Sequence, residues 1–277
     1  MSARPIETPD LGAPVPDTHA HLDMLDDPVA ALTAAARAGV TFVATVVDVT
    51  EEPGRTFDGL AGWLAAADPA PGEVRIIVGC HPHNAKDFSA EAQALLRMYA
   101  ADPRVAAIGE TGLDFHYDNS PRDKQRAAFR TQLAIAREFD VPVVVHLREA
   151  HDEGIAILEE IGVPKAGCVI HCFTADTALA ERFVAMGCHI SFAGPVTFKK
   201  AAALRETAAA VPADRLLVES DCPFLAPEPY RGRANEPAFV TYTAAALARA
   251  RGEDILTFAS SLSANARAIF SRPRGRR

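Results

Sequence analysis

The sequence predicts a single (β/α)8 barrel of the TIM type, and three observations support this fold. The chain has 277 residues, which suits one large α/β barrel or two ordinary domains. Hydrophobic residues make up 49% of it, enough for a large core. Short runs rich in Val, Ile and Ala alternate with longer helix-like runs. Eight such units in a chain of this length are typical of a closed barrel.

The strand-like segments are apolar on both faces, as buried parallel strands are. In chain order they are Val15–Asp17, Phe42–Asp48, Arg75–Cys80, Val105–Gly109, Val141–His146, Gly167–His171, His189–Phe192 and Leu216–Glu219. A doubly wound sheet is the alternative fold. That fold would lack its usual phosphate loop here, because neither GxGxxG nor GxxxxGK(S/T) follows the first segment.

Helical patterns lie between these segments. The clearest, Arg122–Phe139, carries apolar residues at helical spacing. Two others are followed by Gly39 and Gly187, and glycine commonly follows the last residue of a helix. The last two are rich in Ala, which favours helix. These four segments are Asp26–Ala38, Ala175–Met186, Lys200–Ala210 and Ala238–Arg251.

We expect an N-terminal extension over residues 1–14, one barrel domain over 15–271 and a basic, frayed tail over 272–277. The formal net charge of −8 excludes a protein that coats nucleic acid through bulk charge, but allows an enzyme that holds a few phosphates. No apolar run is long enough for a membrane helix, and the N-terminus lacks a signal core. Five scattered cysteines suit a reducing compartment, so we expect a cytoplasmic protein.

Histidines and acids cluster where the predicted strands end. Six of the nine histidines follow or end strands, together with carboxylates on separate strands: His19, His21, His81, His83, Glu110, His146, His171 and Asp221. In a barrel these ends converge on one rim, where the active sites of this fold are built. Imidazole suits Zn²⁺, whereas carboxylates suit Mg²⁺ and Mn²⁺ and can bridge two ions. Even four of these histidines with the two acids exceed the needs of one four-coordinate ion, so we expect a two-metal site.

Several segments carry a family resemblance: DTHAHLD, GCHPH, AIGETGLDFHYDNSPRDKQRAAF, VHLREAHDE, HCFTAD, ISFAGPVTFKK, LLVESDCPFLAP and RGRANEP. In this order and spacing, from Asp17 to Phe270, the chain resembles the TatD family of metal-dependent deoxyribonucleases, within the amidohydrolase-like barrels. The sequence differs from the family pattern at Thr174-Ala175, Ser220, Cys222 and Phe224, where Ser-Gly, Thr, Ala and Tyr are common in the family. The set of metal ligands is complete.

The resemblance implies roles at the matching positions. The first of two divalent ions (Mg, Mn or Zn) would be held by His19, His21, Glu110 and Asp221, and the second by Glu110, His146 and His171. Glu110 would bridge both ions. Asp221 would also orient or deprotonate the attacking water, and His81 would contact the scissile phosphate or assist proton transfer. Arg148, Lys199, Arg231 and Arg233 fall in matching motifs and either hold the nucleic-acid backbone or serve the structure alone.

Some site residues also have an argument of their own. Asp221 follows an apolar strand, where an unpaired buried carboxylate would be costly and a metal would remove the cost. Glu219 lies on the same strand face and is a candidate to hold a ligand histidine. Tyr117, Phe173 and Phe224 are candidates to stack on bases or to pack in the core or rim. For His83, His116, His151 and His189 we expect surface or packing roles.

The resemblance implies a hydrolase that removes nucleotides from the 3′ end of single-stranded DNA, with RNA also open. We expect a monomer. Two alternatives stay open from the residues. One is another barrel metallohydrolase that acts on amide, ester, lactone or aminoacyl-tRNA bonds. It is disfavoured because no lysine lies near the end of strand four. The other is a non-catalytic protein that binds metal or nucleic acid.

Overall fold

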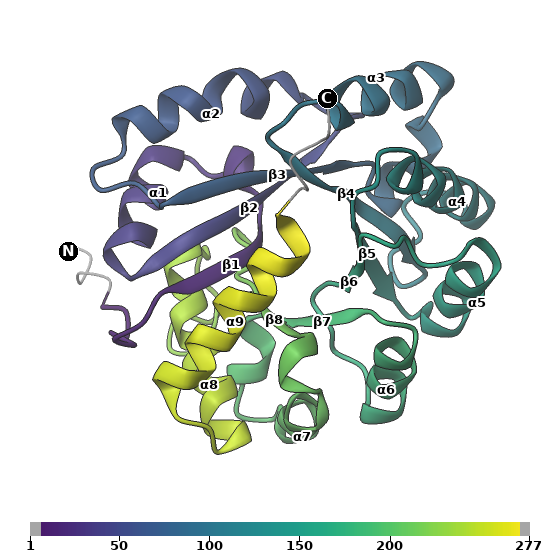
Figure 1. The fold of residues 1–277 in the computed structure, drawn as a ribbon. Helices are drawn as coiled ribbons and strands as arrows, with labels where there is room; N and C mark the ends of the chain where they lie inside the picture. The colour runs from purple at the N-terminus through teal and green to yellow at the C-terminus, as the bar shows by residue number, and fades with distance from the viewer. Residues whose placement is uncertain (1–6, 272–277) are drawn as a thin grey trace.

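The computed structural model describes residues 7–271 and is a barrel of eight parallel strands in sequence order (Figure 1). Each strand pairs with the next one along the chain, which confirms the predicted fold class. The strands are β1 (Val15–Ala20), β2 (Val40–Asp48), β3 (Glu73–Gly79), β4 (Val105–Asp114), β5 (Val143–Arg148), β6 (Cys168–Ile170), β7 (His189–Phe192) and β8 (Leu216–Val218).

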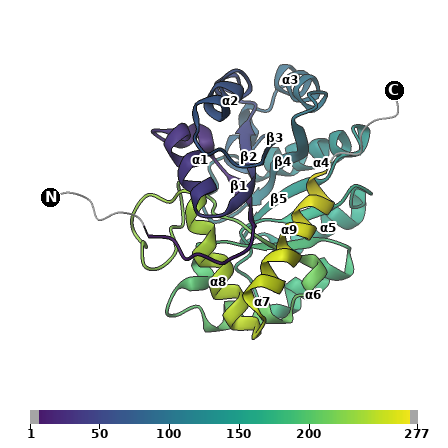
Figure 2. The same cartoon turned by 60° about the vertical axis from the view of Figure 1, so that its left-hand side comes forward.

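Helices connect the strands and surround them (Figure 1, Figure 2). They are α1 (Pro28–Arg37), α2 (Gly54–Ala66), α3 (Ala90–Ala100), α4 (Arg122–Glu138), α5 (His151–Ile161), α6 (Thr177–Ala185), α7 (Ala202–Ala210), α8 (Val240–Arg251) and α9 (Ile255–Phe270). The five predicted helices are confirmed to within about two residues at each end. Gly39 and Gly187 both adopt positive φ after their helices, as glycine there allows.

Two strands continue three or more residues past the C-terminal end that the sequence pattern suggested. The first was expected to end at Asp17 but continues to Ala20, and the fourth was expected to end at Gly109 but continues to Asp114. Both extensions carry polar side chains, which interrupt the apolar pattern although the backbone stays extended. As a result His19 and Glu110 lie within strands rather than after them.

The barrel closes between its first and last strands. Ala20 and Cys222 form an isolated parallel bridge, in which the His21 N–H donates to the Cys222 carbonyl at 2.8 Å. The Asp221 N–H donates to the His19 carbonyl at 2.9 Å. These bonds lie just beyond the end of β8, so they close the sheet at the rim where the predicted site residues lie.

Helices α2, α3, α5 and α9 were not among the predicted helices. The last of them, α9, covers the N-terminal end of the barrel. Its residues Ala266, Ile269 and Phe270 join the apolar cluster inside the strands, and the Phe270 ring stacks on Phe42. In Figure 1 this helix, in yellow, crosses in front of the strand ends. One end of the barrel is therefore sealed, and access to the interior is left to the opposite end.

The described segment before β1, residues 7–14, has no regular helix or strand. The basic tail expected at 272–277 lies outside the described residues, and the domain boundaries stay a prediction. Among residues 7–271, no helix has the length and apolarity that a membrane crossing requires.

Candidate metal centre

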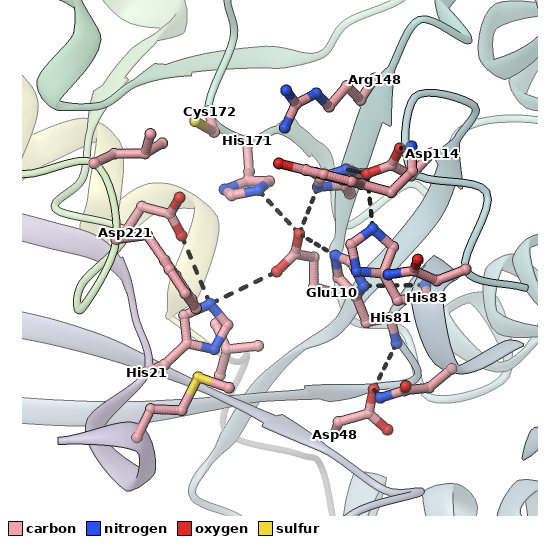
Figure 3. A pocket seen from close by; sticks show the side chains of 18 of the residues that line it. His21, Asp48, His81, His83, Glu110, Asp114, Arg148, His171, Cys172 and Asp221 are labelled. Carbon is pink, nitrogen blue, oxygen red and sulfur yellow. Dashed lines mark hydrogen bonds and ion pairs between the residues drawn. The ribbon is translucent and has the colours of Figure 1, made fainter.

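A cavity of about 660 Å³ opens at the C-terminal ends of the strands (Figure 3). Its walls come from loops after most of the strands, as expected for a barrel site. Seven of the predicted residues line it: His21, His81, Glu110, His146, Arg148, His171 and Asp221. His19 lies beneath, fully buried within β1.

Glu110 stands at the centre of this cavity, and each of its two oxygens faces a different group of donors. Its Oε2 lies 3.1 Å from His19 Nε2 and 3.9 Å from His21 Nε2. Its Oε1 lies 2.8 Å from His146 Nδ1 and 3.0 Å from His171 Nε2. A carboxylate placed in this way can bridge two cations.

The remaining acid of the predicted set belongs to the first group. Asp221 Oδ1 lies 3.8 Å from His19 Nε2 and 3.6 Å from His21 Nε2. Donor atoms of His19, His21 and Glu110 all lie within 4.8 Å of one another. The structure therefore brings together all four side chains expected around the first ion.

The second group differs from the expectation in one respect, because His81 also approaches Glu110 Oε1, at 3.2 Å from Nε2. His81, Glu110 and His146 form a compact group of possible ligands, and His171 contacts the same oxygen. Hydrogen bonds distinguish the three rings. The His83 N–H donates to His81 Nδ1 at 3.1 Å, so His81 carries its proton on Nε2 and acts as a donor there.

His146 and His171 have the opposite arrangement, because each directs its other nitrogen at a carboxylate. His146 Nε2 lies 3.3 Å from Asp114 Oδ2, and His171 Nδ1 lies 3.0 Å from Glu219 Oε1. A proton held on those nitrogens leaves His146 Nδ1 and His171 Nε2 with lone pairs aimed at Glu110. Carboxylates behind ligand histidines commonly set the tautomer in this way.

These donor sets fit divalent cations. Carboxylate oxygens and imidazole lone pairs converge at hydrogen-bond distances, and a cation between them would relieve their mutual repulsion. Burial raises the pKa of Glu110, but His171, His81 and His19 outweigh this and hold it well below its usual value. Burial also lowers the pKa of His171, which Glu110 and Glu219 more than reverse. Without metal, a proton on His171 therefore supplies the positive charge beside Glu110 that a cation would otherwise supply.

Two buried glutamines of α4 hold the strand ends that carry the centre. Gln132 bonds the backbone of Cys80 and the Thr111 hydroxyl, and Gln125 bonds the backbone N–H and carbonyl of Asp114. At Gly112, with φ of 139°, a Cβ would lie 2.0 Å from the His146 carbonyl oxygen. Only glycine allows β4 and β5 to approach this closely.

A further buried acid, Asp17, joins β1 to the segment that carries Asp221. Its carboxyl oxygens accept bonds from the Ser220 N–H at 2.8 Å and the Ser220 hydroxyl at 2.6 Å. Burial raises the pKa of Asp17 to about 8, despite these two donors. The Asp17 side chain contacts no ligand side chain of the expected set; it only accepts the backbone N–H of His19. Its role is therefore structural.

The four predicted substrate-binding cations lie in different places. Arg148 lines the cavity, and its guanidinium carbon lies 4.7 Å from the centre of the Tyr117 ring. Lys199, Arg231 and Arg233 do not line this cavity. Arg231 stacks on Phe198 and Arg233 approaches Tyr230.

Of the three aromatic candidates, two stand at the cavity mouth. Tyr117 and Phe224 line the cavity and are 54% and 49% exposed. Phe173 is 2% exposed and packs against Phe183 and Phe192 in the core. A nucleobase or another flat ring could reach the first two, but not the third.

Sequence reasoning missed three site residues: Asp48, His83 and Asp114. Asp48 Oδ2 accepts from the His81 N–H at 2.8 Å, and Asp114 Oδ2 accepts from His83 Nε2 at 2.8 Å. His83 was expected to serve the surface or packing, but it lines the cavity. The available signal was position, because Asp48 ends the second strand and Asp114 closes the motif GETGLD.

Comparisons with known proteins show which family the chain resembles. A family model described as TatD related DNase matches residues 16–271. The uncharacterized metal-dependent hydrolase YcfH of Escherichia coli is 38% identical over 263 residues, 92% of this chain and 94% of that protein. The 3′-5′ ssDNA/RNA exonuclease TatD of Pantoea vagans is 41% identical over 209 residues, 74% of this chain and 80% of that protein. The crystal structure of the TatD homologue YjjV from Escherichia coli superposes with a TM-score of 0.85 at 29% identity, covering 94% and 98% of the two chains.

Proposed function

The chain belongs to the TatD family of metal-dependent hydrolases, and from this premise we propose that it is a two-metal nuclease. It would remove nucleotides from the 3′ end of single-stranded DNA, and RNA would be a second substrate. The observation that carries the proposal is the position of Glu110, whose two oxygens face two separate donor groups. Exonuclease relatives at about 40% identity support nucleic acid as the substrate.

We assign His19, His21, Glu110 and Asp221 to one divalent ion and Glu110, His146 and His171 to the other. The metals, when bound, would supply a hydroxide nucleophile and stabilise charge on the entering and leaving oxygens. Asp221 reaches into the cavity beside His21, where it can orient the attacking water or accept its proton.

His81 is better suited to the phosphate than to a metal. Its Nε2 carries the proton, because Nδ1 accepts the His83 N–H, and a protonated nitrogen cannot ligate a cation. Asp48 holds the His81 backbone from the other side. Arg148 stands at the mouth over Tyr117, so guanidinium and ring can receive a phosphate and a base together.

The proposal is tested by a time course on 5′-labelled single-stranded DNA and RNA. The enzyme is stripped of metal, then supplied with Mg²⁺, Mn²⁺ or Zn²⁺, and compared with Glu110→Gln. The matched control is Glu159→Gln, an exposed glutamate on α5. A descending ladder that requires metal and Glu110, and survives in the control, is expected. An intact label with every metal would overturn the nuclease assignment.

A further inference from the structure

A second cleft lies outside the candidate metal centre, on the flank of the barrel. It has a volume of about 390 Å³ and is formed by the 3₁₀ helix η3 (Gly194–Thr197) with α7 and α8. Three cations line it, Lys199, Arg205 and Arg249, and no carboxylate is among the described residues that do. We call it the basic cleft.

The cations of the basic cleft lack the acidic partners that several arginines elsewhere in the protein have. No ion pair or hydrogen bond joins the side chain of Lys199 or Arg249 to any residue within 7–271, and both residues are exposed. Four other outer-helix arginines, by contrast, face acids: Arg97–Glu138, Arg126–Glu153, Arg130–Glu160 and Arg182–Asp152. In a chain of net charge −8, unpaired cations gathered in one cleft indicate an anionic ligand.

The third cation holds the shape of the cleft. One Arg205 nitrogen donates to the carbonyl oxygens of Val196 and Phe198, at 3.0 and 2.8 Å. The segment that carries Lys199 is thereby fixed to α7. The guanidinium keeps its charge while it makes these bonds, so it adds to the positive potential of the cleft.

The basic cleft adjoins the catalytic cavity across η3. Pro195 and Leu225 line the cavity, whereas Val196 and Phe198 line the cleft. At Gly194 the backbone of η3 closely approaches the loop that carries Leu225, since a Cβ on Gly194 would lie 2.0 Å from the Leu225 carbonyl oxygen. Arg231 stacks on Phe198 at 4.2 Å, also without an acidic partner among the described residues. It adds a further cation beside Phe198, which lines the cleft.

We propose that the basic cleft binds backbone phosphates of the nucleic-acid strand that leaves the catalytic cavity. Lys199 and Arg249 contact the phosphates, Arg205 shapes the cleft, and Arg231 contacts the strand where it crosses η3. This inference rests on the proposed nuclease function and adds a second, distant contact for longer substrates. It explains how a chain with negative net charge can hold a polyanion.

The test measures binding of a fluorescein-labelled 15-nucleotide single-stranded DNA by anisotropy, with chelator present so that no cleavage occurs. The affinity is followed as salt is raised. The double variant Lys199→Gln/Arg249→Gln is compared with Lys165→Gln, an exposed lysine in the loop before β6, at the opposite end of the barrel. We expect the slope of log K against log salt to fall by about 1.4 in the double variant, about 0.7 for each lost phosphate contact. The slope of the control stays at the wild-type value.

A kinetic experiment with metal reads the same contact separately. In the wild type, KM should be lower for the 15-mer than for a dinucleotide. This ratio of KM values should shrink several-fold in the double variant. The single variant Arg249→Lys, which keeps the positive charge, should retain part of it. A double variant with the wild-type slope and the wild-type KM ratio would overturn the basic cleft. A wild-type enzyme that binds the 15-mer but cleaves nothing with any metal would overturn the nuclease function instead.

Discussion

Replacing Asp114 by asparagine tests whether the tautomer of His146 prepares the centre for metal. Asp114 Oδ1 accepts the backbone N–H groups of His116 and Tyr117, at 3.0 and 2.9 Å. An asparagine must keep its carbonyl oxygen there, since its NH2 group cannot accept. The NH2 group then takes the place of Oδ2 and faces the rings of His146 and His83.

This exchange reverses the hydrogen bond to His146. Nε2 must now accept, so the ring proton moves to Nδ1, the nitrogen that lies 2.8 Å from Glu110. The lone pair needed for a metal is then lost. Loss of such a supporting carboxylate usually weakens metal binding 10–100-fold, which is about 1.4–2.8 kcal/mol.

The assay is a titration of metal-free Asp114→Asn with Zn²⁺ or Mn²⁺ in a calorimeter. Asp123→Asn, an exposed aspartate in the first turn of α4, serves as the matched control. We expect one class of binding to weaken in the variant and neither class to change in the control. Equal affinities in a folded Asp114→Asn protein would refute the assignment of tautomers.

Three further predictions follow from the same structure. Tyr117→Ala and Phe224→Ala should each raise KM for oligonucleotides several-fold with little change in kcat, because base stacking contributes about 1–3 kcal/mol; an unchanged KM would show that the rim does not hold bases. Metal addition should release protons, because burial lowers the pKa of His146 but Asp114 and Glu110 raise it above its usual value. Affinity should therefore fall as the pH drops through this raised pKa, and a pH-indicator titration that detects no protons would contradict this. Asp17, with a pKa raised to about 8, imposes a cost that is absent below about pH 4 and grows until about pH 8. Asp17→Asn should thus gain stability relative to wild type between pH 5 and 8 in urea denaturation of metal-free protein, and a constant difference would count against a buried, protonated Asp17.

Much of the fold could be predicted because its signals are local. Apolar runs such as those of β2 and β3 identify buried strands, and the amphipathic pattern of α4 identifies a helix. Helix α9 escaped because it packs on the barrel end rather than against one strand, so neither its neighbours in sequence nor its pattern indicated its place. The polar ends of β1 and β4 escaped because backbone pairing, rather than apolarity, keeps them extended.

The chain also determined which residue types would meet, since parallel strands in a barrel bring all their C-terminal ends to one rim. Only the tertiary structure decided how they meet. The direction of each Glu110 oxygen and the choice of His83 as the partner of His81 depend on ring orientation and on register between strands distant in sequence. The same holds for Lys199, which the motif placed beside the substrate residues and the fold placed in a separate cleft across η3. Sequence specifies donors and their order along the rim, whereas packing sets the distances and the protons that turn them into a site.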